Sequence, residues 1–404
     1  MRILYLAHRI PYPPNKGDKI RSFHELRVFS RSHEIHLLAF FDDPDDRRHI
    51  GELRKFCADV ELVPLSRPIQ AFKAGATMLK RRPWTLGYFS SRRMREAIAS
   101  KIRMNNFDIV FAYSSSMAGY LATTSLGRVL DFVDSDASKW AQYVRYTSIP
   151  WSWIYGFEAS ALTRFEQEMI TAFDRSIFVS KREIGSYAEN VPHEKLCFIK
   201  NGIDIEFFQP SESREKGSVV IFTGAMDYFP NADAVVQFAR HVFPIVRTKC
   251  PSARFLIVGS NPTSAVRRLA RLPGIEVTGS VPDIRVFLSS AHVAVAPLRI
   301  AQGIQNKLLE AIAMGLPVVA TASAAGGIPD CASLPISIVE GNHDFAEKVI
   351  SHLERPRLSK KEVRQYREHL RKNYDWNENL SRFEDIFRSV SANRTIVSDP
   401  QVVS

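Results

Sequence analysis

The side chains best suited to chemistry lie in the segment Pro297–Thr321, PLRIAQGIQNKLLEAIAMGLPVVAT. It predicts a strand, a polar loop that contains Gly303, and a helix that begins near Gln305. Unpaired backbone N–H groups at such a helix start can bind a diphosphate, and Lys307 in the first turn adds a positive charge. Glu310 follows one turn later, where its carboxylate can accept hydrogen bonds from two ribose hydroxyls. On spacing alone, an ordinary strand-to-helix connection with solvated charges fits equally well.

Two aspartates, Asp134 and Asp136, follow the apolar run VLDFV. Their carboxylates at a strand end could bind Mg²⁺ or Mn²⁺ across a diphosphate. Capping of the next helix is an equally available role for either side chain. The four cysteines are scattered without CxxC spacing, which favours free thiols in a reducing cytoplasm. We therefore expect no metal site and no cofactor.

A basic segment runs from Arg67 to Arg103, with ten Lys and Arg residues and a single acid, Glu96. Such a charge attracts anions, and amphipathic basic segments with aromatic residues are typical of an anionic membrane interface. The candidate membrane contacts are Lys80, Arg81, Arg82, Trp84, Arg92 and Arg93. The alternative is a helix that packs on the core through Met94, Ile98 and Ile102 and exposes a solvated basic face. No nucleic-acid-binding module is recognisable, so nucleic acid is not an expected partner.

Secondary-structure elements must hold these side chains in place. Short apolar runs that alternate with helical patterns predict such elements along the chain. The expected strands of a first sheet are 3–7, 35–40, 60–63, 109–111, 129–133 and 177–179. A second series is expected at 219–223, 255–258, 275–277, 293–296 and 318–320. This alternation predicts parallel strands with crossover helices, in two tandem α/β domains that bind ligands at the carboxyl ends of their strands.

Length and composition agree with two domains, because 404 residues with 45% hydrophobic and 24% charged side chains are ordinary for such a protein. We place an N-terminal domain at 1–200, a linker at 201–217 and a C-terminal domain at 218–374. Residues 375–390 are predicted to form a helix that returns to the N-terminal domain, and 391–404 a loose tail.

The sequence contains no run of about 18 apolar residues, so we expect no transmembrane helix. The opening MRILYLAHR is short and lacks a small-residue cleavage site. It therefore predicts a buried first strand and not a signal peptide. We expect a cytoplasmic protein, with peripheral binding to the inner face of the plasma membrane if the basic segment contacts lipid.

The stretch Glu310–Val319, EAIAMGLPVV, resembles the donor-binding signature of glycosyltransferase family 4, whose GT-B fold has two Rossmann-like domains facing across a cleft. In that signature a first Glu stands eight positions before the second. The first Glu aligns with Gln302, which keeps a hydrogen-bonding amide but loses the charge. The resemblance implies that Glu310 binds the ribose and that Gln302 contacts the donor sugar. The other donor-binding residues that it implies are Gly303, Ile304 and Lys307.

The resemblance extends over nearly the whole chain. The stretch PPNKGDKIRSFHELRVFSRSHEIHLL resembles the family's glycine loop, with Gly17-Asp18 in place of the usual Gly-Gly. There, Lys19 and Arg21 at the helix start could meet phosphate. The stretch KNGIDIEFFQP resembles the hinge between the domains, and FTGAMDYFPNADAV, with Gly224, resembles the loop that opens the nucleotide domain.

Two positions depart from the family pattern. Many relatives carry Arg and Lys on the loop that opens the nucleotide domain, but this loop has no basic residue. Phosphate binding then falls to Lys307, with Arg299 as a second candidate. The family's His in the N-terminal domain has no counterpart at the equivalent strand end, so Asp134 or Asp136 is the candidate there.

The resemblance implies a retaining enzyme that moves a hexosyl group from a nucleotide-sugar to a glycan or lipid-linked acceptor bound by the N-terminal domain. The implied catalytic residues are Lys307, Gln302 and Asp134, with Lys307 and the helix-start N–H groups neutralising charge on the departing diphosphate. The segments GAMDY and PLRIAQGIQNKLLEA are similar to a subgroup associated with exopolysaccharide synthesis and the PEP-CTERM system. Two alternatives stay open: a nucleotide-sugar epimerase of the same fold, and a non-catalytic, membrane-associated nucleotide-sugar-binding protein.

Overall fold

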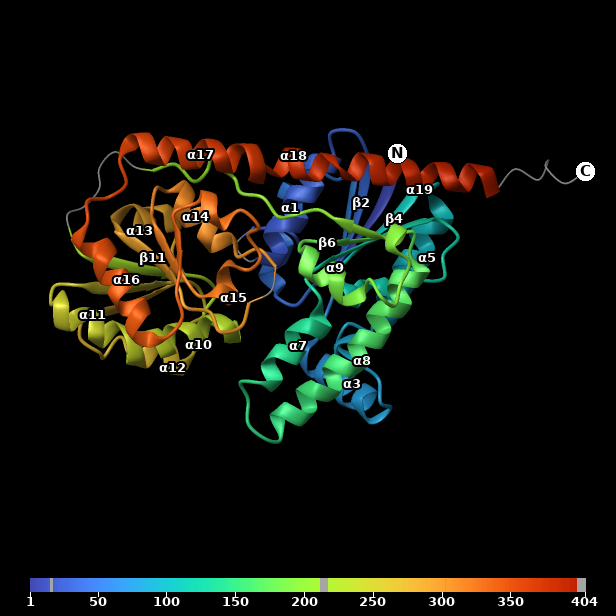
Figure 1. The fold of residues 1–404 in the computed structure, drawn as a ribbon. Coiled ribbons are helices and arrows are strands. Elements are labelled where there is room, and N and C mark those ends of the chain that lie inside the picture. The colour runs from blue at the N-terminus through green and yellow to red at the C-terminus, as the bar shows by residue number, and fades with distance from the viewer. Residues whose placement is uncertain (15–16, 211–216, 302, 398–404) are drawn as a thin grey trace, which may run out of the picture. The chain divides into compact units, whose positions relative to one another are not determined.

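The computed structural model describes residues 1–14, 17–210, 217–301 and 303–397. The chain divides into two compact units (Figure 1). Unit 1 comprises Met1–Lys200 together with the segment from Asn377 onward, and unit 2 comprises Asn201–Trp376. Each unit is a parallel sheet with helices around it, which confirms the predicted pair of α/β folds.

The sheet of unit 1 has seven strands in the order β3-β2-β1-β4-β5-β6-β7, all parallel. Its strands are β1 (Arg2–Ala7), β2 (Glu34–Phe41), β3 (Asp59–Pro64), β4 (Ile109–Tyr113), β5 (Gly127–Val133), β6 (Arg175–Phe178) and β7 (Leu196–Phe198). In register, Tyr5 of the interior strand β1 lies between Leu37 of β2 and Phe111 of β4. The six strands expected from the apolar runs are present, and the edge strand β7 is an addition.

Helices cover both faces of this sheet. They are α1 (Gly17–Phe29), η1 (Pro44–His49), α2 (Ile50–Leu53), α3 (Arg67–Leu79), α4 (Trp84–Tyr88), α5 (Arg92–Met104), α6 (Ser115–Ala118), α7 (Asp136–Val144), α8 (Trp151–Ala172), α9 (Lys181–Tyr187), η2 (His193–Lys195) and α19 (Phe383–Val397). Leu4 and Leu6 of β1 pack into a core with α5, α6, α8 and α9. Tyr5 points the opposite way and stacks on Phe111. That second face is covered by α1 and α19 through Phe29.

Unit 2 has a six-stranded parallel sheet in the order β10-β9-β8-β11-β12-β13. Its strands are β8 (Val219–Thr223), β9 (Arg254–Val258), β10 (Ile275–Gly279), β11 (Val293–Ala296), β12 (Val318–Ala320) and β13 (Ile336–Ile338). Its helices are α10 (Phe229–Gln237), the π-helix η3 (Phe238–Val242), α11 (Phe243–Lys249), α12 (Ser264–Leu269), α13 (Ile284–Ser290), α14 (Asn306–Ala313), α15 (Ala322–Ala325), η4 (Cys331–Ser333), α16 (Asn342–Glu354) and α17 (Lys360–Tyr374). The five predicted strands are confirmed, and β13 is again an unpredicted edge strand.

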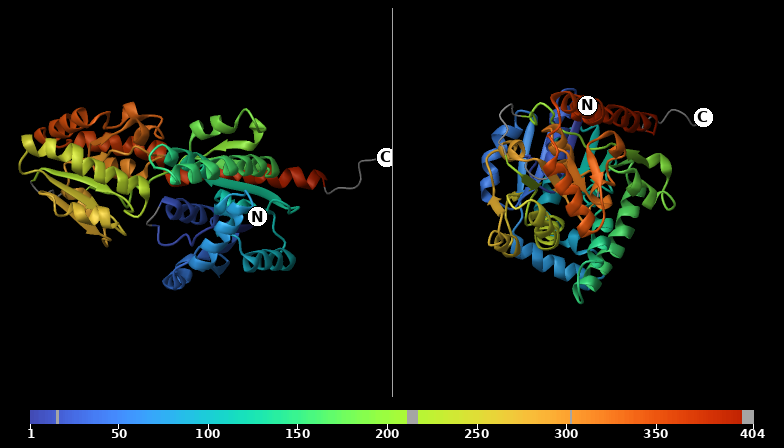
Figure 2. Two further views of the ribbon diagram at one scale, coloured as in Figure 1. Left: turned by 90° about the horizontal axis from the view of Figure 1, so that it is seen from below. Right: turned by 60° about the vertical axis from the view of Figure 1, so that its left-hand side comes forward.

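The helices α3, α7 and α8 of unit 1 extend away from its sheet. The helices α7 and α8 pack along each other, and α3 packs on α4. Figures 1 and 2 show α7, α8 and α3 extending together beyond the edge of the sheet. The short α18 (Trp376–Ser381) lies at the boundary between the units, and the described part of the predicted linker begins with Asn201.

Candidate functional site

In unit 2, two glycines bring the strand ends unusually close together at the edge where β8 and β9 stop. Gly224 follows β8 with φ +153°, and Gly259 follows β9 with φ +156°. A Cβ atom on Gly259 would lie only 1.7 Å from the carbonyl oxygen of Gly224. Only glycine allows this backbone contact, so the two loops are fixed against each other.

Lys307 points to the same place from the first turn of α14. Its Nζ donates a hydrogen bond to Oδ1 of Asn231 at 2.5 Å and lies 4.4 Å from the ring centroid of Phe222. A Cβ atom on Gly224 would lie 3.2 Å from this Nζ, so the glycine keeps the space beside the cation open. Asn231 is itself held by donating Nδ2–H to the carbonyl of Ala225 at 2.9 Å. The neutral amide of Asn231 therefore positions the ammonium group of Lys307 at the carboxyl ends of β8 and β9.

Among the described residues, no carboxylate lies within ion-pair distance of Lys307, whose Nζ is hydrogen-bonded to the amide of Asn231. Burial lowers the pKa of Lys307 to about 7, and Glu310 offsets only part of that shift. Burial likewise raises the pKa of Glu310 to about 7, with Lys307 opposing it. An anion bound here would stabilise the charged lysine, which is the electrostatic property that a diphosphate site needs.

Glu310 lies one turn beyond Lys307, half-buried, and no described residue donates a hydrogen bond to its carboxylate. The helix is anchored by its other face, since Leu308, Leu309 and Ile312 are buried in the core of unit 2. The carboxylate oxygens are thus available to hydroxyl donors, as the ribose prediction requires.

The loop before α14 is set by a second glycine contact. Gly303 has φ +56°, and a Cβ atom on Gly327 would lie 1.8 Å from its carbonyl oxygen. Ile304 is buried in the core, so any contact of this residue with a donor would involve its backbone. The predicted sugar contact Gln302 lies outside the described residues. Arg299, the second phosphate candidate, forms a two-point ion pair with Asp233, with Nε at 2.9 Å from Oδ2.

In unit 1, the predicted glycine loop leads into α1 at Gly17, and a Cβ atom there would meet no atom within 4 Å. The next residue, Asp18, pairs with Nε2 of His8 at 3.5 Å and with Arg9 at 3.1 Å. Burial alone would raise the pKa of Asp18, but the hydrogen bond and charge of His8, with the charge of Arg9, lower it below its ordinary value. His8 stacks on Tyr113 at the end of β4. Sequence reasoning missed His8, although it directly follows the first predicted strand.

The expectation that Arg21 meets phosphate is wrong. Arg21 is fully buried on the inner face of α1. Its Nε and Nη2 donate to Oδ2 of Asp131 at 3.0 and 2.6 Å, and Nε lies 3.0 Å from Glu25. The helix turns this guanidinium into the core, where Asp131 is its counter-ion, while burial and the charge of Asp131 raise the pKa of Glu25. Lys19 remains near the surface, with Nζ 3.7 Å from Asp46.

The two aspartates after β5 differ in their surroundings. Asp136, in the first turn of α7, accepts hydrogen bonds from Ser115 at 3.0 Å and Lys139 at 2.9 Å. Asp134 is half-buried, and its Oδ1 has no partner among the described residues. Burial raises the pKa of Asp134 to about 6, with Lys139 opposing and Asp136 adding to the shift. The helix cap is Ser135, so the capping role considered for either aspartate is wrong.

The basic segment divides into an inner and an outer part. α5 buries Met94 and Ile98, and Lys101 pairs with Asp59 and Glu61, so this helix packs on the core with a solvated basic face. Trp84 is half-buried against Trp140 and Tyr155. The other candidate membrane contacts, Lys80, Arg81, Arg82, Arg92 and Arg93, are exposed.

Large apolar side chains are exposed nearby in sequence: Ile69, Phe72 and Leu79 on α3, with exposed fractions of 55%, 79% and 87%, and Ile149, Trp151 and Trp153 at the start of α8. No helix in the described ranges is long and apolar enough to span a bilayer. Among all the residues that the structure describes, no group of three or more His, Cys, Asp or Glu side chains could hold a metal ion.

Comparison with known proteins supports the assignment of the fold. Residues 217–355 match the family model described as glycosyl transferases group 1. Sucrose-phosphate synthase from Thermosynechococcus elongatus is similar with a TM-score of 0.70 and 14% identity, over 97% of this chain and 100% of that one. Anabaena HepE, solved in complex with UDP, is similar at 0.68 and 13%, over 96% and 100%. WaaG, described as a glycosyltransferase involved in lipopolysaccharide biosynthesis, is similar at 0.63 and 16%, over 95% and 99%.

No curated protein sequence matches the chain. The structural similarities extend over both units and establish the GT-B fold, which confirms the predicted fold class. The residues that match the glycosyl transferases group 1 model lie within unit 2 and include Lys307 and Glu310.

Proposed function

We propose that the chain is a retaining glycosyltransferase, on the basis of the group 1 match over residues 217–355 and of the GT-B fold. It moves a sugar from a nucleotide-sugar donor to a glycan or lipid-linked acceptor in bacterial exopolysaccharide synthesis. No metal or other cofactor takes part. The enzyme works on the cytoplasmic side of the plasma membrane, which it binds peripherally.

The observation that carries this proposal is the arrangement of Lys307 and Glu310 at the glycine-lined strand edge of unit 2. The Nζ of Lys307 has space beside it because Gly224 has no side chain. Its depressed pKa makes an anionic ligand the natural partner of its charged form. One turn away, Glu310 has carboxylate oxygens available to two hydroxyl groups. A diphosphate followed by a ribose matches this order of groups.

In the proposed reaction, Lys307 donates hydrogen bonds to the departing diphosphate. Negative charge grows on the leaving oxygen as the bond to the sugar breaks, and a pre-positioned cation in a partly buried site stabilises that charge. The backbone N–H groups of Asn306 and Lys307, at the start of α14, would add to this stabilisation. Glu310 holds the ribose and keeps the donor in register.

The choice of donor to test first follows from solved proteins of the same fold. Anabaena HepE was solved with UDP and with UDP-glucose. UDP-sugars are therefore the first set for a thermal-shift screen, because a ligand that binds only the folded protein raises its apparent stability. The anomeric configuration of the product, read by NMR, tests the retaining assignment.

Replacement of the lysine is the decisive experiment. Lys307→Ala should lower kcat for sugar transfer by about 100- to 1,000-fold, the usual effect of removing one donor to a developing oxyanion. The matched control is Lys348→Ala, which removes an exposed lysine from α16 of the same unit. Normal turnover by a folded Lys307→Ala protein would refute the proposed role. Conversion of the donor, without any acceptor, into an epimeric sugar would instead identify an epimerase.

A further inference from the structure

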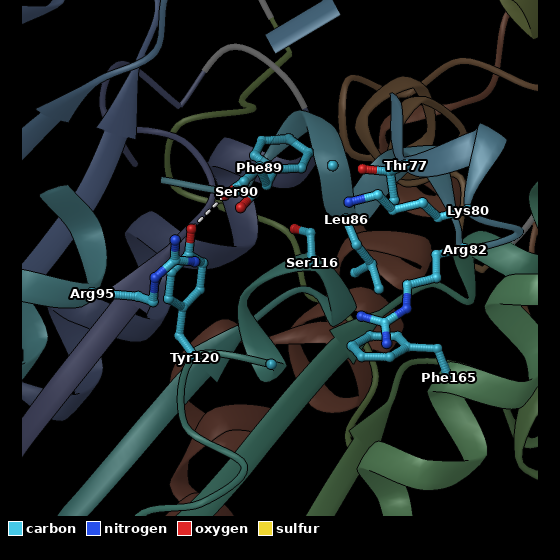
Figure 3. Close-up of a pocket in the computed structure, with 12 residues that line it drawn as sticks. Thr77, Lys80, Arg82, Leu86, Phe89, Ser90, Arg95, Ser116, Tyr120 and Phe165 are labelled. Carbon is cyan, nitrogen blue, oxygen red and sulfur yellow. Dashed lines mark hydrogen bonds between the residues drawn. The ribbon is translucent and has the colours of Figure 1, made fainter. Parts of the chain in front are cut away.

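Unit 1 contains a cavity of about 410 Å³ that the donor site does not use. It is formed by the end of α3, by α4 and the residues on either side of it, by the first turn of α5, by α6 and the turn after it, and by α8 (Figure 3). Figure 3 shows Lys80 and Arg82 on one side of the cavity and Arg95 beside Tyr120 on the other, with Ser116 between them. A cavity of this size holds a small ligand and not merely a water molecule.

The lining of this cavity is strongly cationic. Lys80, Arg82 and Arg95 all contribute to it, and no carboxylate does. None of the three forms an ion pair with a described residue, whereas Arg92 on the same α5 helix pairs with Glu96. Three uncompensated cations around one cavity repel one another, so an anion bound between them would be stabilised by all three.

The walls of the cavity are held by specific bonds. The hydroxyl of Tyr120 accepts a hydrogen bond from the backbone N–H of Ser91 at 2.7 Å and donates one to the carbonyl of Phe89 at 2.5 Å. Lys73 of α3 donates to the carbonyl of Ser90 at 2.8 Å. Gly87 lets α4 lie against α3, since a Cβ atom there would be 2.3 Å from Oγ1 of Thr77. Lys80 and Arg82 lie in the short turn between α3 and α4, where their backbone N–H groups donate to the carbonyl of Thr77 at 3.1 and 3.2 Å.

One helix joins the cavity to an exposed apolar surface. α3 supplies Thr77 to the lining and Lys80 directly follows it, while Phe72 and Leu79 of the same helix are 79% and 87% exposed. A ligand with an anionic end and an apolar chain would satisfy both parts. The opposite wall of the cavity lies near the carboxyl end of β1, because Phe89 contacts His8, the residue after β1, with ring centroids 5.7 Å apart.

We propose that this cavity binds the phosphate-bearing end of a lipid-linked acceptor, with the lipid chain leaving past Phe72 and Leu79. The inference rests on the proposed function, which it deepens by naming the acceptor class. Arginine binds phosphate oxygens with two parallel hydrogen bonds, and lysine adds a point charge. The remaining lining of Leu86, Phe89 and Phe165 accommodates the less polar part of the head group.

Vesicle binding by the full-length protein tests the proposal without a donor. Phosphatidylcholine vesicles are doped with a polyprenyl phosphate, with the neutral polyprenol, or with phosphatidylglycerol at the same total charge. The polyprenyl phosphate vesicles should bind most tightly. The variant Lys80→Gln/Arg82→Gln/Arg95→Gln should lose about 100-fold in affinity for them, because three charge-assisted contacts are removed.

The matched control is Arg31→Gln/Arg54→Gln/Arg103→Gln, which removes three exposed cations of unit 1 that lie outside the cavity. It should keep the preference for polyprenyl phosphate. Thermal unfolding checks that both variants fold, and the thermal shift with UDP-sugars reports the donor site separately. If the proposed function is wrong, the wild-type protein will show no thermal shift with UDP-sugars. If only the cavity assignment is wrong, the wild-type protein will still show that shift.

Three results would overturn the inference. The first is equal binding to polyprenyl phosphate and phosphatidylglycerol vesicles, which would show only a general attraction to anionic lipid. The second is unchanged binding by a folded cavity variant. The third is binding of soluble glucose 1-phosphate as tightly as the lipid, which would make the cavity a site for free phosphate esters.

Discussion

Lys307 and Glu310 titrate in the same range, with pKa values displaced to about 7 from opposite sides. Donor binding uses the charged form of both, so the signs of the two effects oppose each other. As pH rises above about 7, Lys307 loses its proton and diphosphate binding weakens. As pH falls below about 7, Glu310 gains a proton and ribose binding weakens. Affinity for UDP-glucose should therefore peak near pH 7, with limbs approaching about tenfold per pH unit.

Calorimetric titrations of UDP-glucose across this pH range check the profile in two variants. Lys307→Arg keeps a charge at all these pH values, so the alkaline limb should disappear. Glu310→Gln cannot ionise, so the acid limb should disappear while the alkaline limb stays. An alkaline limb that persists in Lys307→Arg would contradict the assignment.

A second prediction at the residue scale concerns the buried network around Arg21. Arg21→Gln should destabilise unit 1 by about 3–5 kcal/mol, because the carboxylate of Asp131 would stay buried without its counter-ion. Tryptophan fluorescence during urea unfolding can follow this, since four of the five tryptophans lie in unit 1 and Trp376→Phe removes the fifth. The exposed Arg31→Gln should change stability by less than about 0.5 kcal/mol.

The position of a site residue could be predicted only where the order of strand, loop and helix within one short segment determines it. Lys307 and Glu310 could be placed because a strand, a loop and a helix start follow one another within one segment. Arg21 could not, because its direction depends on Asp131, 110 positions away in the sequence. The pairing of His8 with Asp18 likewise depends on how β1 and α1 meet. Arg299 is similar, since it lies in the loop after β11 and its partner Asp233 lies on α10.

Among the elements, the loop before α14 depends on the contact between Gly303 and Gly327. Gly327→Ala should force this loop away, because the new methyl group would overlap the carbonyl of Gly303 at 1.8 Å. We expect UDP-glucose affinity to fall at least about tenfold, with about 1–3 kcal/mol lost in stability. Gly326→Ala is the control, since its Cβ would meet nothing closer than a carbonyl at 3.1 Å. Equal donor affinity in the two variants, measured by calorimetry, would contradict this.

The elements themselves were largely predictable. Eleven strands were expected from apolar runs, and each is present, because buried parallel strands carry continuous Val, Ile and Leu. The two missed strands, β7 and β13, are three-residue edge strands. Such strands are only partly buried and form because a neighbouring strand pairs with them, so their own residues carry little signal.

At the scale of the molecule, a net charge of +11 and the exposed apolar face of α3 predict reversible membrane binding. Phe72→Ser/Leu79→Ser should weaken sedimentation with anionic vesicles by about tenfold or more, since two side chains would no longer insert. Raising the salt concentration should also weaken binding. Val286→Ser, which changes a 65% exposed valine of unit 2, should have no effect. Binding that survives the double substitution would place the contact elsewhere.

The way unit 1 is completed determines the order in which the chain can fold during synthesis. Phe383 and Phe387 of α19 pack on Phe29 and Phe111, and Val390 lies against Gly127. These residues leave the ribosome only after all of unit 2 has been made. Unit 2 can therefore reach its native state while the core of unit 1 is still open on one face. Until α19 has been synthesised, the aromatic side chains of Phe29 and Phe111 on this face of unit 1 stay exposed to solvent and to other proteins.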